Sequence, residues 1–232
     1  MKEPNMVEVR ESLLALWDID GTLLSPSGGG NADYEEAIIA VFPRAVLGDV
    51  HTHGKTDRQV VEEYLVSAGI DVTNAPLVLE QLDVISHKYL TDAGRIPALS
   101  GVDHTLARLD RYGIVNGLLT GNTPARAINK LQGSGMATAY LTWGESFFGA
   151  NAPLRPVMTQ RARERYPSRP IVVIGDTPLD GAAAAAAGLH FVGVATGVYD
   201  AGELQAAGAI VVVDDLVTGA EVLDATLLRL TG

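Results

Sequence analysis

The sequence contains no cysteine, which excludes both a disulfide framework and a thiolate metal site. Basic residues are also few: 17 Lys and Arg stand against 28 Asp and Glu, and the net charge is -11. Such a chain repels nucleic acids and anionic membranes at long range, so we expect neither as a partner. A phosphate-bearing ligand would have to be held by local features of the site.

Long apolar runs are missing as well. The N-terminal segment is acidic where a signal peptide would be basic. No stretch approaches the roughly 18 uninterrupted apolar residues that a membrane span requires. We therefore expect a soluble, cytoplasmic protein, and a homodimer is compatible with the sequence.

Short apolar runs, by contrast, recur along the chain and have the length of strands. They are residues 13–17, 114–119, 171–174, 191–194 and 210–213. Runs that are apolar throughout suit strands covered by helices on both faces, as in a parallel sheet. Apolar residues at helical spacing, such as Val102, Leu106 and Leu109, lie between them. The sequence therefore predicts a doubly wound α/β domain.

About ninety residues separate the first two runs, far more than one crossover helix needs. Apolar residues recur helically there around 34–41, 60–68 and 78–89, with Asp57 as an expected N-cap. We predict a core domain of residues 1–24 and 99–232, and a small helical cap of residues 25–98. Gly28–Gly30 and Arg95–Gly101 would connect the two. The alanine run 182–187 predicts one buried, tightly packed helix.

Three of the apolar runs end in polar residues, Asp18, Thr120 and Asp176. Because the carboxyl ends of parallel strands border the ligand crevice, we expect these residues to converge. Asp20 follows Asp18 by two positions, and Gly21 allows a tight turn that folds one carboxylate over the other. Mg²⁺ prefers oxygen ligands, usually a few carboxylates with water and substrate phosphate. Asp18 and Asp176 fit that role.

Four segments in this order resemble the haloacid dehalogenase superfamily, in its phosphoglycolate-phosphatase-like branch with an inserted helical cap. They are Asp18 to Leu24, Leu118 to Thr123, a later basic residue, and Gly175 to Asp180. The resemblance covers nearly the whole chain. It implies that Asp18 attacks phosphorus to form an aspartyl-phosphate, while Asp20 protonates the leaving oxygen and later activates water.

The same resemblance implies a magnesium site. Mg²⁺ would be bound by Asp18, the backbone carbonyl of Asp20 and Asp176, with Asp180 in support. Because Asp20 has no metal bond through its side chain, and neighbouring carboxylates raise its pKa, we expect it to stay protonated. Thr120 would hold a phosphoryl oxygen, helped by backbone N–H groups of Gly121 and Asn122 where a helix begins.

The third segment departs from the family pattern, which usually has Lys. The corresponding place reads Ala-Pro-Leu-Arg-Pro, and we assign the role to Arg155, which can clamp phosphate oxygens in bidentate fashion. A surface arginine is the alternative, and Lys130 is then the reserve candidate.

The predicted cap contains the segment His51-Thr52-His53-Gly54-Lys55-Thr56-Asp57. Its Gly-Lys-Thr is no P-loop, because position 49, where that motif needs Gly, is Asp. Lys55 could bind the distal end of a substrate or be an exposed lysine before a helix. We take His51 and His53 as loop residues, because two histidines without a third ligand do not make a metal site.

Together these features predict a Mg²⁺-dependent phosphoric monoester hydrolase acting on a small phosphorylated metabolite, phosphoglycolate-like or a sugar phosphate. A phosphomutase of the same superfamily would also keep Asp20 and is the first alternative. A catalytically silent phosphate-binding module is the second. The sequence does not identify the substrate, because a cap selects it through shape and a few side chains.

Overall fold

The structure, a computed structural model, describes residues 11–26, 31–92 and 95–231. The predicted connection at Gly28–Gly30 and the N-terminal ten residues lie outside this part. In the described residues no helix has both the length and the apolar character needed to cross a membrane.

Six strands form one sheet in which every neighbouring pair is parallel. In chain order they are β1 (Leu14–Trp17), β2 (Val115–Thr120), β3 (Phe147–Phe148), β4 (Ile171–Gly175), β5 (His190–Val194) and β6 (Val211–Val213). Their order across the sheet is β3-β2-β1-β4-β5-β6. The five strands predicted from apolar runs are confirmed. The two-residue edge strand β3 was not predicted.

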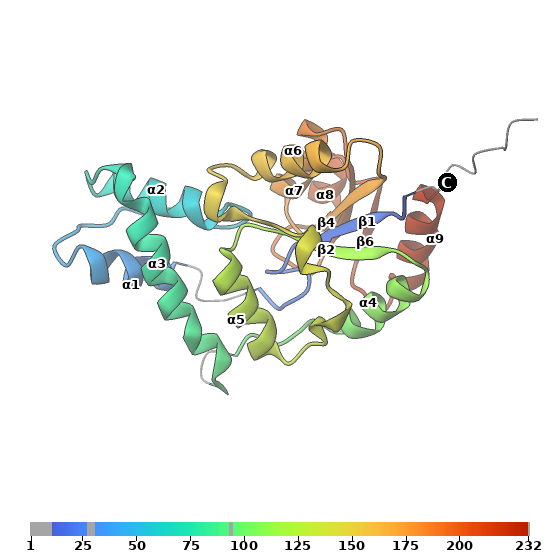
Figure 1. The fold of residues 1–232 in the computed structure, drawn as a ribbon, viewed down its shortest axis with the longest axis horizontal. Helices are drawn as coiled ribbons and strands as arrows, with labels where there is room; N and C mark the ends of the chain where they lie inside the picture. Colours follow the sequence, from blue (N-terminus) through green and yellow to red (C-terminus); the bar gives the residue numbers. More distant parts are fainter. Residues whose placement is uncertain (1–10, 27–30, 93–94, 232) are drawn as a thin grey trace, which may run out of the picture.

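Helices cover both faces of the sheet, which confirms the doubly wound α/β prediction (Figure 1). One face carries α4 (Val102–Arg111), α5 (Pro124–Ser134) and α9 (Ala220–Leu230), and the other carries α6 (Arg155–Arg165), α7 (Pro178–Ala186) and α8 (Ala201–Ala206). The alternation of side chains along each strand explains the two layers. Ala15 and Trp17 belong to the cluster under α4, whereas Leu14 and Leu16 belong to the cluster under α6.

The alanine run forms most of α7, as the helix propensity of Ala predicts. Only Ala183 and Ala184 of the run are buried, however, so the prediction of one buried, tightly packed helix is correct for one side of the helix and wrong for the other. One side of α7 faces solvent, and small residues are needed only on the other. A Cβ at Gly181 would lie 2.4 Å from the carbonyl oxygen of Ala207.

Between β1 and α4 the chain forms α1 (Ala32–Val41), α2 (Asp57–Ser67) and α3 (Ala75–Ser86), followed by the 3₁₀ helix η2 (His87–Leu90). These helices have a hydrophobic cluster of their own, which includes Tyr34, Val61 and Leu82. The cap of α2 is Thr56, whose Oγ1 accepts a hydrogen bond from the Gln59 amide at 3.0 Å. The prediction of Asp57 as N-cap is therefore wrong by one residue. We call residues 31–92 the helical insertion.

The two chain passages that join the helical insertion to the sheet run side by side. Leu24 and Ala98 form an antiparallel bridge, and the Ser25 amide donates to the Pro97 carbonyl at 2.9 Å. The insertion packs against α5, beside the ends of the strands (Figure 1). The division into domains at residues 24 and 99 stays a prediction.

Candidate active site

Residues from three strand ends surround one cavity of about 90 Å³. Asp18 follows β1, Thr120 ends β2 and Asp176 follows β4. Eight of the predicted site residues line the cavity: Asp18, Asp20, Lys55, Thr120, Gly121, Asn122, Arg155 and Asp176. The ninth, Asp180, is fully buried in the first turn of α7, and its carboxylate lies within 4.8 Å of those of Asp18 and Asp176. The structure thus brings the predicted residues together.

The turn after β1 depends on glycine. Gly21 has a φ of +85°, which side-chain-bearing residues rarely adopt, and this confirms the predicted tight turn. A Cβ at Gly21 would stand 2.2 Å from Oδ2 of Asp176, and one at Gly197 would stand 1.8 Å from the same atom. The two glycines therefore make the space in which the Asp176 carboxylate lies.

Asp18, Asp176 and Asp180 form a cluster of buried carboxylates with one cation among them. Arg155 places Nη2 3.0 Å from Oδ2 of Asp18 and 2.6 Å from Oδ1 of Asp180. Burial raises the pKa of Asp18 to about 6; Arg155 opposes this rise, whereas Asp180 adds to it. Burial and the negative charge of Asp18 raise the pKa of Asp176 well above its ordinary value. The cluster carries more negative charge than its surroundings compensate.

This cluster fits a divalent cation such as Mg²⁺, because its donors are all hard oxygens and a single arginine leaves two negative charges unbalanced. Asp176 uses Oδ1 to accept a hydrogen bond from the Thr22 hydroxyl at 3.0 Å, which orients the carboxylate. Asp180 accepts through Oδ2 from the amide and hydroxyl of Thr177, while its Oδ1 faces Arg155. Asp180 is thus placed to orient its neighbours, and Asp18 and Asp176 are better placed as direct ligands.

Arg155 begins α6 and is only 3% exposed, so the alternative of a surface arginine is wrong. Besides the two aspartates it donates from Nη2 to the Leu119 carbonyl and from Nη1 to the Gly54 carbonyl, each at 3.2 Å. One guanidinium therefore joins the carboxylate cluster, the end of β2 and a loop of the helical insertion.

Asp20 is held away from that cluster by α5. Its two carboxylate oxygens accept hydrogen bonds from Nζ of Lys130 at 2.8 and 2.7 Å, and Oδ2 accepts another from Nδ2 of Asn122 at 2.8 Å. Burial alone would raise the pKa of Asp20, but the charges of Lys130 and Arg126 and these hydrogen bonds lower it. The prediction that Asp20 stays protonated is therefore wrong for the ligand-free protein, because the sequence did not place Lys130 beside it.

Thr120 is fully buried, and its Oγ1 accepts from the amide and the side-chain nitrogen of Asn122 at 3.3 and 2.8 Å. The following helix starts later than predicted. α5 begins at Pro124 and is capped by Thr123, whose Oγ1 accepts from the Arg126 amide at 3.2 Å. Gly121 and Asn122 thus lie in the loop before the helix and not in its first turn.

The residues predicted in the cap stand at the rim of the site. Lys55 lines the cavity, but its Nζ is 2.6 Å from a carboxylate oxygen of Glu63 on α2. His51 and His53 lie in a loop, as predicted, with their rings 5.2 Å apart and edge to face. Among the described residues, the group of three or more potential metal ligands is the aspartate cluster.

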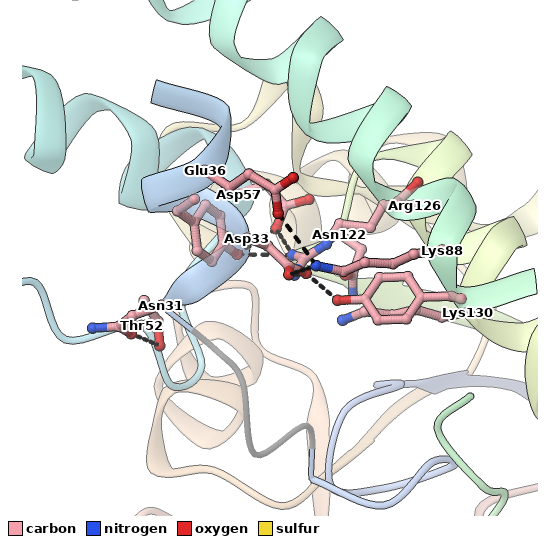
Figure 2. Close-up of polar contacts among 12 residues, drawn as sticks. Asn31, Asp33, Glu36, Thr52, Asp57, Lys88, Asn122, Arg126 and Lys130 are labelled. Atoms are coloured by element: carbon pink, nitrogen blue, oxygen red, sulfur yellow. Dashed lines mark hydrogen bonds and ion pairs between the residues drawn. The ribbon is translucent and has the colours of Figure 1, made fainter. Parts of the chain in front are cut away.

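Sequence reasoning missed a buried ionic network between the helical insertion and α5 (Figure 2). Arg126 donates from Nη1 to Asp57 at 2.7 Å and to the Tyr34 hydroxyl at 2.9 Å, and from Nη2 to Asp33 at 3.2 Å. Asp33 also accepts from Lys88 and from the Tyr89 hydroxyl. Tyr34, Asp57 and Arg126 line the cavity, so the network forms its wall on the insertion side.

Comparison with known proteins agrees with this architecture. Residues 153–218 match the HAD-hydrolase-like family. No curated protein matches the chain.

Three solved structures illustrate the likeness in fold. A Bacteroides fragilis protein described as a haloacid dehalogenase-like hydrolase is 23% identical, with a TM-score of 0.67, over 90% of this chain and 99% of that one. A protein described as a predicted phosphatase, from Clostridium acetobutylicum, is 16% identical, with a TM-score of 0.67, over 95% of this chain and 99% of that one. A protein described as a putative β-phosphoglucomutase, from Thermotoga maritima, is 20% identical, with a TM-score of 0.56, over 93% of this chain and 99% of that one.

At such identities the likeness of the structures concerns the fold, and the sequence match concerns one part of the chain. The two are consistent with each other and with the order of the site segments along the chain. The chain thus shares its fold, over nearly its whole length, with a structure described as a haloacid dehalogenase-like hydrolase, and its residues 153–218 match the sequence model of the HAD-hydrolase-like family.

Proposed function

We propose that this protein is a Mg²⁺-dependent phosphatase that hydrolyses a small phosphate monoester through an aspartyl-phosphate on Asp18. One observation carries the proposal. A buried aspartate cluster with an excess of negative charge lies in the same small cavity as a second aspartate, Asp20, that is held apart from it. This arrangement separates a nucleophile and metal site from an acid/base group, as hydrolysis of a phosphate ester requires.

In the first step, an oxygen of Asp18 attacks phosphorus, and the bond from phosphorus to the ester oxygen breaks. The leaving oxygen takes a proton from Asp20 and departs as an alcohol. In the second step, water attacks the phosphorus of the aspartyl-phosphate, Asp20 accepts a proton from that water, and phosphate and free Asp18 are released.

Asp20 is ionised in the ligand-free site, because Lys130 and Asn122 stabilise its carboxylate. A bound phosphate dianion adds negative charge beside it and thereby raises its pKa, so that the acid needed for the first step is formed with the substrate in place. After the alcohol has left, the ionised carboxylate is the form that acts as a base toward water.

Neutralisation of the transferring group must supply much of the acceleration. Mg²⁺ held by Asp18, Asp176 and the Asp20 carbonyl, with Asp180 in support, would compensate the charge of the phosphoryl oxygens. Arg155 already contacts Asp18 and is the protein's own cation at that position. Thr120, with the backbone N–H groups of Gly121 and Asn122, is suited to binding a phosphoryl oxygen.

The substrate we expect is a small phosphorylated metabolite, either phosphoglycolate-like or a sugar phosphate, encountered in the cytoplasm. The small volume of the cavity, about 90 Å³, supports the proposal of a small substrate. Lys55 is a candidate for contact with its distal end, although its pairing with Glu63 neutralises the charge that would attract a carboxylate.

A phosphomutase is the second candidate, because a structure described as a β-phosphoglucomutase has the same fold over 93% of this chain. In a mutase the aspartyl-phosphate would be transferred to a second hydroxyl of the substrate instead of to water. The two activities therefore differ in whether inorganic phosphate is released.

The test is phosphate release from a panel of small phosphate esters, with Mg²⁺ or with a chelator. Asp18→Asn should abolish turnover, because an amide oxygen is a poor nucleophile and a poorer metal ligand. Asp110→Asn is the matched control, since Asp110 is exposed on α4 and does not line the cavity.

Turnover that needs Mg²⁺ and Asp18, and that survives Asp110→Asn, would establish the phosphatase. Conversion of a sugar phosphate to its isomer without phosphate release would establish the mutase. If the folded protein binds Mg²⁺ and phosphate but converts no ester, it is a phosphate-binding module and the proposal is wrong.

A further inference from the structure

Lys130 is a buried cation whose only part in the proposed reaction so far is to stabilise the ionised carboxylate of Asp20. It lies on α5, is 1% exposed and lines the cavity. In the sequence analysis it is the reserve candidate for the basic residue of the third segment, which would clamp phosphate oxygens. Arg155 contacts Asp18 instead, and Nζ of Lys130 lies 2.8 and 2.7 Å from the two carboxylate oxygens of Asp20.

We propose that Lys130 is a positioning residue, which fixes the carboxylate of Asp20 in the orientation needed for proton transfer to and from the reacting oxygen. The inference rests on the proposed function, because it assigns Asp20 the acid/base role.

The geometry of Asp20 shows why such a residue is needed. Its side chain is 30% exposed and stands directly before Gly21, whose φ is positive, so packing alone leaves its rotamer poorly fixed. Contact of one ammonium with both oxygens fixes the plane of the carboxylate, and Asn122 adds a third contact on Oδ2. Proton transfer requires a donor and acceptor within hydrogen-bond reach, so a freely rotating carboxylate would be less efficient.

Lys130 is itself held by the interface between α5 and the helical insertion. Its ammonium lies 5.6 Å from the centre of the Tyr89 ring on η2, within the range of a cation–π contact. The hydroxyl of Tyr89 donates to Asp33, which also binds Arg126 (Figure 2). Lys130 therefore lies between the carboxylate of Asp20 and the ring of Tyr89, at the interface of α5 with the helical insertion.

A loss of correct positioning has a kinetic signature that a general loss of stability lacks. The value of kcat/KM reports steps up to the departure of the leaving group. Departure of an alkoxide needs protonation by Asp20, whereas 4-nitrophenolate is stable as an anion and needs little help. Removal of the Lys130 ammonium should thus lower kcat/KM for an alkyl phosphate by about 100-fold, and for 4-nitrophenyl phosphate by less than about 10-fold.

The experiment compares Lys130→Met with wild type on these two esters, with thermal unfolding as a check of the fold. Lys88→Met is the matched control, because Lys88 belongs to the same ionic network through Asp33 but is 41% exposed and does not contact Asp20. We expect Lys88→Met to change the ratio of the two kcat/KM values by less than about twofold, the spread of repeated measurements.

A chemical rescue keeps the test decisive if Lys130→Met folds poorly. Because the chain has no cysteine, Lys130→Cys contains a single thiol. Alkylation with 2-bromoethylamine in denaturant, followed by refolding, replaces the lysine by its thioether analogue and restores the ammonium. Wild type taken through the same steps is the control. The analogue should recover kcat/KM on the alkyl phosphate to within about tenfold of wild type, whereas unmodified Lys130→Cys should not.

If wild type converts neither ester, the proposed function itself fails. If wild type is active and Lys130→Met lowers both kcat/KM values equally, or if the restored ammonium does not recover activity on the alkyl phosphate, Lys130 has a structural role only and the inference is overturned.

Discussion

Gly21 combines a backbone requirement with a packing requirement. Its φ of +85° costs a side-chain-bearing residue about 1–3 kcal/mol, and a Cβ there would displace the Asp176 carboxylate. We predict that Gly21→Ala lowers the free energy of unfolding by about 1–3 kcal/mol, measured by urea denaturation, and also abolishes phosphatase activity.

The control for this prediction is Gly69→Ala. Gly69 has a φ of +68°, and a Cβ added there would meet no described atom within 4 Å, so the substitution brings the strain without the clash. It should lose a similar amount of stability and keep its activity. Equal activities of the two variants would show that the space beside Asp176 is not needed for catalysis.

Arg155 contacts four groups with one planar guanidinium, which a lysine ammonium cannot do from the same backbone position. We predict that Arg155→Met lowers kcat by about 10²–10³-fold, because Asp18 and the transferring phosphoryl group lose their fixed cation. Arg155→Lys keeps the charge and should lose less. Arg165→Met, on the exposed side of the same helix, should leave kcat unchanged. If Arg155→Lys were as inactive as Arg155→Met, geometry and not charge would be the essential property.

At the scale of elements, Asp57 is one of the residues that join the helical insertion to α5 and to the loop before it. This residue accepts from Arg126 at 2.7 Å, from the Tyr34 hydroxyl at 2.6 Å and, through Oδ2, from the Thr123 amide at 2.7 Å. Asp57→Ala leaves the Arg126 guanidinium buried beside fewer acceptors, so we predict a loss of about 3–5 kcal/mol of unfolding free energy.

A double-mutant cycle checks this prediction by urea denaturation. Arg126→Met removes the orphaned charge, so Asp57→Ala combined with Arg126→Met should cost less than the sum of the single changes. Additive losses would mean that the ion pair contributes nothing and that each residue acts through its other contacts.

The elements and the site differ in how well they could be predicted from the sequence. Strands such as 171–174 are apolar throughout because both faces are covered, and this pattern is visible without a structure. The convergence of Asp18, Thr120 and Asp176 followed from one topological rule. β3, with two residues, is too short to give a pattern, and the helix after Thr120 began later than its N-terminal residues suggested.

The ionic network was missed for a different reason. Asp33, Asp57, Lys88 and Arg126 lie on four separate elements, and each alone looks like part of a solvated helix face. Only the packing of the insertion on α5 buries them together. The same packing brings Lys130 to Asp20, which is why the predicted protonation of Asp20 was wrong. Pairings across an interface depend on tertiary structure that local patterns do not encode.

At the scale of the whole molecule, the aspartate cluster makes stability depend on pH. The pKa of Asp18 is about 6 in the folded protein against 3.8 for an unperturbed Asp, and that of Asp176 is also raised. From about pH 4 to pH 6 the unfolded chain therefore binds fewer protons than the folded one, so stability falls as pH rises through this window. The lowered pKa values of Asp20 and Asp33 act in the opposite sense, but below pH 3.8, where these groups take up protons.

Mg²⁺ binds the ionised carboxylates, so it must displace protons at low pH and relieves their repulsion at higher pH. We predict that saturating MgCl₂ raises the Tm more at about pH 7.5 than at about pH 5, measured by scanning calorimetry.

Asp176→Asn removes one charge but keeps the oxygen that accepts from Thr22. This variant should therefore raise the Tm of the metal-free protein at about pH 7.5 and abolish the response to Mg²⁺. A Tm that rises equally with Mg²⁺ at both pH values, or that falls in metal-free Asp176→Asn, would mean that carboxylate repulsion does not limit the stability of this fold.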